Sequence, residues 1–265
     1  MEKLLSILIC LLLASNLLAQ PSNGKLRQPS KATIEANIQA NIRQLENHPN
    51  NLNLYLQIAE SYLELKEFEK ATDWYDKAVR VSPNNAEVLY WKGIAQYRTG
   101  EIQWAEAASD FMKATKKDKS FHQPYVYLGR IYRQIGKLEL AEHFLNQGLK
   151  LKSNDSELLT ERAELFRAAN QPEQALDDLI LAISQNGQFA PAYAALANFY
   201  FDRKDYNKAV DYANQALSIE ENHLPALRTR AHSFIRKNQA TQACSDIEQL
   251  RLAGENLDDF KVQCY

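Results

Sequence analysis

A small residue returns at nearly constant spacing along the chain, and this repeat limits the fold more than any other feature. The intervals are 34, 36, 34, 34 and 34 residues, between Ala59, Gly93, Gly129, Ala163, Ala197 and Ala231. A bulky residue stands four positions before each, and in five of six units an aromatic residue follows three positions later. Spacings of three and four lie on one face of a helix. The sequence therefore predicts six copies of one helical unit.

A second helix is predicted in every unit, built around a recurring alanine at Ala71, Ala107, Ala141, Ala175, Ala209 and Ala243. Four of the six turns between the helices carry glycine or asparagine, which tolerate the left-handed backbone that ends a helix. This pattern resembles the tetratricopeptide repeat, a helix–turn–helix unit of 34 residues. The most regular copy runs from Leu52 to Asn85, with Tyr55, Ala59, Tyr62, Ala71, Tyr75, Ala78 and Pro83 at the family's positions.

The resemblance implies an all-α, right-handed α-solenoid of about six repeats, because one helix pair cannot bury its apolar face without neighbours. The expected repeats are 52–85, 86–121, 122–155, 156–189, 190–223 and 224–253. An N-terminal helix is predicted before them from the spacing of Ile34, Ile38, Ile42 and Leu45. A C-terminal capping helix is predicted within 254–265, with Leu257, Phe260 and Cys264 on one face.

The N-terminus reads as an export signal over residues 1–19, followed by a flexible linker over 20–30 and the solenoid domain over 31–265. Lys3 supplies a positive start, and the run from Leu4 to Leu13 is apolar but too short to span a bilayer. The alternative is a buried N-terminal helix. Cys10 lies inside the apolar run, so lipidation is not predicted. The mature chain would carry no transmembrane anchor and would act in the periplasm or outside the cell, as in exported bacterial repeat proteins.

Two cysteines remain after signal removal, Cys244 and Cys264. An even number in an oxidising compartment predicts a disulfide, and a helix returning after the turn at Gly254 would bring the two sulfurs level. Two free thiols are the alternative.

Buried charges are predicted in every second unit. The residue immediately before the small residue is apolar in the first, third and fifth units but Lys or Arg in the second, fourth and sixth. The residue three positions after the second-helix alanine alternates in the same units, from aromatic to Asp. The exchange predicts three salt bridges, Lys92–Asp110, Arg162–Asp178 and Arg230–Asp246. The alternative is a set of ligand-binding charges, which the matched partners disfavour.

No catalytic motif, metal-ligand spacing or phosphate-binding glycine loop is present, so we expect no enzyme activity, metal or cofactor. The net charge of −2 provides no field for nucleic acid. The remaining candidate is the concave groove that the resembled family lines with its first helices. Carried onto this chain, that groove contains Tyr90, Ile94, Tyr97, Arg98, Tyr127, Arg130, Arg133 and Arg167. Further positions are Val126, Arg228, His232 and Arg236.

Aromatic and arginine side chains suit an extended peptide that carries carboxylates, although an ordinary solvated surface explains them equally well. The Lys and Asn clamp of some family members is not supported, because Leu56 and Glu60 stand in the first copy. The sequence thus predicts a non-catalytic interaction scaffold or assembly factor that binds a protein or peptide partner. A constitutive accessory subunit of a cell-envelope complex is the first alternative, and an enzyme with an unrecognised groove site is the second.

Overall fold

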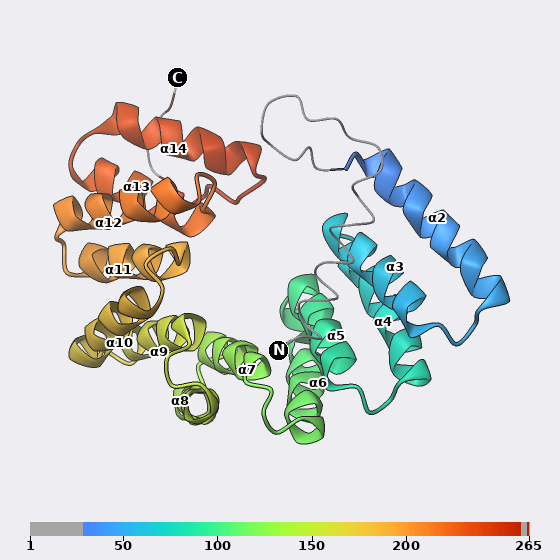
Figure 1. The fold of residues 1–265 in the computed structure, drawn as a ribbon. Helices are drawn as coiled ribbons and strands as arrows, with labels where there is room; N and C mark the ends of the chain where they lie inside the picture. The colour runs from blue at the N-terminus through green and yellow to red at the C-terminus, as the bar shows by residue number, and fades with distance from the viewer. Residues whose placement is uncertain (1–28, 261–263, 265) are drawn as a thin grey trace.

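The computed structural model describes residues 29–260 and residue 264. Within them the chain is helical, with one short 3₁₀ turn and no strand. The predicted signal peptide (1–19) and nearly all of the predicted linker lie outside the described residues. An N-terminal helix, α2 (Lys31–Asn47), precedes the repeats, as predicted. The described helices follow one another along an open curve from α2 to α14 (Figure 1).

Six helix pairs make up the curve. Their bounds are α3 (Leu52–Glu64) and α4 (Phe68–Val81), α5 (Ala86–Thr99) and α6 (Trp104–Lys117), α7 (Gln123–Gln134) and α8 (Leu138–Leu151), α9 (Ser156–Ala168) and α10 (Pro172–Gln185), α11 (Ala190–Asp202) and α12 (Tyr206–Ile219), and α13 (Leu224–Arg236) and α14 (Ala240–Leu252). We number these pairs as units one to six. The two helices of each unit contact each other, and the second helix of units one to five contacts the first helix of the next unit. From unit three onward, the first helices of successive units are also in contact. The fold is the all-helical solenoid that the repeat predicts.

The recurring small residues lie where the two helices of a unit meet. All twelve are buried. A Cβ added at Gly129 would lie 2.4 Å from Leu145 Cγ on the facing helix, and one at Gly93 would lie 2.8 Å from Phe111 Cε1. These approaches are too close for any side chain, so the glycines set how near α5 and α6, and α7 and α8, can pack.

Every unit turns through one residue with a positive φ angle. The predicted glycine and asparagine turns are present, and the other two units use Lys66 (φ 59°) and Lys204 (φ 62°). The 36-residue interval arises from two additional residues in unit two. They extend the turn into the 3₁₀ segment η1 (Glu101–Gln103) before α6 begins.

The C-terminal cap is not the helix that the sequence predicts, at least as far as residue 260. Gly254 (φ 81°) ends α14, and Asn256 Oδ1 then accepts the backbone N–H of Asp258 at 2.7 Å. This side-chain bond replaces a helical one, as asparagine commonly does in turns. Leu257 and Phe260 still pack against the apolar end of unit six. Cys244 and Cys264 form a disulfide, with Cα atoms 5.4 Å apart.

Candidate functional site

The alternating charges of the even units are held inside the solenoid. Lys92 Nζ lies 2.9 Å from Asp110 Oδ2. The two arginine pairs are bidentate, with nitrogen–oxygen distances of 2.7 and 2.8 Å in unit four and 2.9 and 2.6 Å in unit six. All three carboxylates are buried. The structure thus forms the three predicted pairs, which join Lys92 to Asp110, Arg162 to Asp178 and Arg230 to Asp246.

A third polar side chain completes each of these pairs, and the sequence reasoning missed it. Asp76 accepts from Lys92 at 2.8 Å, Asn146 from Arg162 at 2.8 Å, and Asn214 from Arg230 at 2.7 Å. Each of the three stands five residues after the second-helix alanine of the preceding odd unit. This recurring polar position could have predicted the third partner from the sequence. The cations are therefore fully engaged in joining odd units to even ones.

Aromatic side chains gather on the inner helices α5 and α7. The ring centroids of Tyr90 and Tyr127 are 5.9 Å apart, those of Tyr97 and Tyr127 are 5.5 Å apart, and those of Tyr90 and Trp91 are 5.4 Å apart. All four rings are partly exposed. We call these four residues the aromatic shelf. Ile94, which the sequence placed in the groove, is 5% exposed and belongs to the core.

The predicted groove arginines are mostly not available to a ligand. Arg130 Nε donates to Glu161 Oε1 at 2.8 Å, and Arg133 Nη2 donates to Glu161 Oε2 at 3.2 Å. Burial raises the pKa of Glu161, but the two arginines outweigh it and hold the carboxyl below its ordinary range. These arginines therefore do not stand free for peptide carboxylates, since Glu161, absent from the predicted set, already pairs with both.

The remaining predicted groove cations differ from one another in whether they already form ion pairs within the protein. Arg167 donates to Asp202 Oδ2 at 2.6 Å and to Glu164 Oε2 at 2.9 Å. Arg228 binds Asp259 at 2.7 Å, and the His232 ring stacks on Phe260 with centroids 4.3 Å apart, so the C-terminal segment covers this end of the inner face. Arg98 is exposed and has no ion pair within the described part of the chain.

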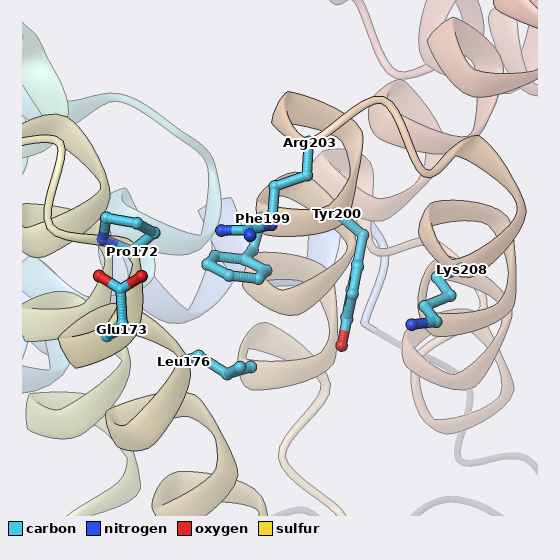
Figure 2. A pocket seen from close by; sticks show the side chains of 7 residues that line it. All are labelled: Pro172, Glu173, Leu176, Phe199, Tyr200, Arg203 and Lys208. Carbon is cyan, nitrogen blue, oxygen red and sulfur yellow. The ribbon is translucent and has the colours of Figure 1, made fainter.

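Two pockets lie near the turns of the solenoid, and Trp104 in the wall of the second stacks on Tyr97 of the aromatic shelf. The first, of about 300 Å³, is lined by Pro172, Glu173, Leu176, Phe199, Tyr200, Arg203 and Lys208, from α10, α11 and α12 (Figure 2). The second, of about 320 Å³, lies between α6 and α7 at the same repeat positions, with Trp104, Ala108, Ile131 and Ile135 among its walls. Both occur where an even unit meets an odd one. Their recurrence marks them as packing features of the doubled period.

Two further properties of residues 29–260 bear on function. No helix there has the length and apolar character needed to cross a bilayer. In the same range, no three His, Cys, Asp or Glu side chains converge as metal ligands would.

Comparison with known proteins places this geometry in a family. The model described as "Cilia and flagella-associated protein 70 C-terminal domain", a tetratricopeptide-repeat model, matches residues 19–245. The chain belongs to this family. Its curated relatives include the anaphase-promoting complex subunit cut9 of Schizosaccharomyces pombe, 26% identical over 187 residues (67% of this chain and 27% of cut9). They also include the repeat-containing protein YpiA of Bacillus subtilis, 25% identical over 170 residues (64% of this chain and 40% of YpiA). The chain thus spans well under half of these two relatives.

Solved structures agree on the fold. The APC/C hetero-tetramer Cut9–Hcn1 aligns with a TM-score of 0.69 and 20% identity, over 86% of this chain and 44% of that one. PilF of Pseudomonas aeruginosa aligns with a TM-score of 0.58 and 16% identity, over 77% of this chain and 93% of that one. Tetratricopeptide-repeat relatives act as protein-interaction scaffolds, and the family is generally non-catalytic.

Proposed function

We propose that this chain is a non-catalytic scaffold or assembly factor of the exported bacterial type, and that it holds a segment of a partner protein against its inner face. The observation that carries the proposal is the aromatic shelf. Partly exposed tyrosine and tryptophan rings that already touch one another offer a large contact area, and little side-chain freedom is lost when a partner covers them. Such residues dominate the binding energy of protein interfaces.

Export of the chain is part of the proposal. The apolar N-terminal run and the pairing of Cys244 with Cys264 both suit an oxidising compartment outside the cytoplasm. Mass spectrometry of protein purified from its native host without reductant tests this directly. We expect a mature N-terminus near residue 20 and a mass lower than that of the reduced chain by two hydrogen atoms. An intact N-terminus with two free thiols would contradict export.

A photo-crosslinking experiment tests the inner face as the binding surface. A photoreactive amino acid replaces Arg98, which is exposed beside the shelf, and in a matched variant it replaces Leu181, which is 41% exposed on the second helix α10. We expect a specific adduct from position 98 and none from position 181. Adding Tyr97→Ala should weaken that adduct several-fold, because Tyr97 leaves the shelf. Equal adducts from both positions, or an adduct indifferent to Tyr97→Ala, would contradict the proposal.

A further inference from the structure

The inner face contains two junctions between units at which the same repeat position has opposite charge. Glu60 in unit one and Arg130 in unit three each follow the small residue of their first helix. Glu87 and Glu157 are each the second residue of the next unit's first helix. The junction of units three and four, whose first helices α7 and α9 contact each other, therefore shows which ion pairs these repeat positions can form.

At the junction of units three and four, a guanidinium fills the space between the helices. Arg130 donates to Glu161 Oε1 through Nε at 2.8 Å, and its Nη2 lies 3.8 Å from Glu157 Oε1. The guanidinium of Arg130 thus lies beside two carboxylates, and we call this junction closed because its charges pair within the protein. The position of Glu161 is occupied by Trp91 in unit two.

At the junction of units one and two, the position of the cation is taken by a second acidic residue, Glu60, in addition to Glu87. Glu60 and Glu87 have no Lys, Arg or His ion partner among the described residues, and neither carboxylate has a hydrogen bond there. Burial raises the pKa of Glu60, and the neighbouring Glu87 carboxylate raises it further. Two carboxylates without a cation are thus held close enough to repel each other.

A buried hydroxyl at the same place also lacks a partner. Tyr75 is completely buried, and its Oη accepts and donates no hydrogen bond within the structure. Burial raises its pKa, and the next contributions come from Glu60 and Glu87, so the hydroxyl lies in the field of this carboxylate pair. Trp91 packs against the cluster that contains Tyr75. An unpaired buried hydroxyl is unfavourable, so this junction has an unmet polar group beneath its two carboxylates.

We infer that Glu60, Glu87 and the Trp91 ring form a seat for a cationic side chain, lysine or arginine, of the bound segment. The incoming cation takes the place that Arg130 fills two units later. Two carboxylates supply the opposite charge, and the face of an indole ring attracts a cation at close range. The aromatic shelf continues from Trp91 to Tyr127, so the same segment carries apolar or aromatic residues next to its cation. This inference rests on the proposed function and gives its partner a chemistry.

An array of synthetic peptides tests the inference without knowledge of the partner. The peptides have 15 residues of matched length and apolar content, and differ at one central position, which is Lys, Arg, Gln or Glu. We expect the protein to retain Lys and Arg peptides about tenfold more strongly than Glu peptides, and high salt to reduce the difference. Glu60→Gln with Glu87→Gln should bring the ratio within about twofold of unity while apolar peptides still bind.

The control carries the same change in net charge on the other side of the solenoid. Glu106→Gln with Glu139→Gln alters two exposed carboxylates on α6 and α8 and should leave the preference unchanged. Retention without preference for Lys or Arg, or an equal loss in both double variants, would overturn the cation seat and leave the groove intact. If no peptide is retained, or if Tyr97→Ala changes nothing, the groove itself fails and the seat fails with it.

Discussion

The two junctions of the inner face differ in how far the chain neutralises itself. Between units three and four, Arg130 and Arg133 both pair with the buried carboxylate of Glu161, and Glu157 lies 3.8 Å from Arg130, although Arg133 Nε has no hydrogen-bond partner in the part of the chain that the structure describes. Between units one and two, the Glu87 carboxylate adds to the raised pKa of Glu60, and neither side chain has an ion pair among the described residues. The same scaffold therefore offers a closed surface in one place and an open one in another. Charge on a repeat surface is available to a partner only where the protein does not already use it.

The largest expected effect comes from opening the closed junction. Glu161→Gln leaves half-buried Arg133 without a carboxylate and Arg130 with only the more distant Glu157, which should lower the free energy of unfolding by about 3 kcal/mol. Urea denaturation measures this loss. Glu157→Gln is the matched control, because that side chain is 44% exposed and 3.8 Å from Arg130, so it should cost less than about 1 kcal/mol. Equal losses from the two variants would show that the network is not closed around Glu161.

The second prediction converts the open junction into a copy of the closed one. Glu60→Arg places a guanidinium opposite Glu87, as Arg130 lies opposite Glu157. We expect a gain of about 1 kcal/mol in unfolding free energy and loss of the preference for Lys and Arg peptides. Glu60→Gln, which removes the charge without adding a cation, should give a smaller gain. A Glu60→Arg variant that keeps the preference would contradict the seat.

A smaller effect is expected from the unpaired hydroxyl beneath the carboxylates. Tyr75→Phe removes a buried group that has no hydrogen bond, and should stabilise the protein by up to about 1 kcal/mol in thermal or urea unfolding. Tyr97→Phe is the control, because its hydroxyl donates to Gln134 Oε1 at 3.2 Å. That variant should be neutral or slightly destabilising. Loss of stability in Tyr75→Phe would mean that the hydroxyl has a partner, and that the junction has no unmet polar group.

The smallest effect concerns pH. The folded-state pKa of Glu60 lies above its ordinary value of 4.5, so ionised Glu60 costs stability above that raised pKa, and the cost disappears as pH falls below 4.5. Glu60→Gln should therefore raise stability at neutral pH by about 0.2–0.5 kcal/mol, the usual size of a like-charge contact, and the gain should vanish near pH 4. Melting temperatures across this range test the sign. A gain that grows on acidification would contradict it.

The architecture was predictable because packing in a repeat leaves a periodic record. Small residues stand where helices touch, and a half-buried cation such as Arg162 pairs with the buried carboxylate of Asp178 within its own unit. The turns at Lys66 and Lys204 were not predictable, since lysine has no preference for a positive φ and is held there by the repeat. The cap was mispredicted because apolar spacing suggested a helix, while Asn256 bonds to the local backbone instead.

The groove was predictable only in outline. Its positions followed from the resemblance, but the partners of Arg130 and Arg133 lie 28 to 31 residues away on the next first helix. Spacing within one unit cannot reveal a contact between units. The sequence therefore predicted that the two arginines are free to bind a peptide, whereas both form ion pairs with Glu161. Replacing Arg130 and Arg133 together would consequently be a poor probe of binding, because it would leave the buried Glu161 carboxylate without a partner and threaten the fold.

The most direct test of the contrast is the titration of individual glutamate carboxyls, followed by NMR of protein labelled with ¹³C at the glutamate Cδ and assigned with Glu60→Gln and Glu161→Gln. The pKa of Glu60 should lie above 4.5 and that of Glu161 below it. A saturating Lys peptide should lower the midpoint of Glu60 and leave that of Glu161 unchanged. Coincident midpoints for the two carboxyls, or a reversed order, would contradict the distinction between an open and a closed junction.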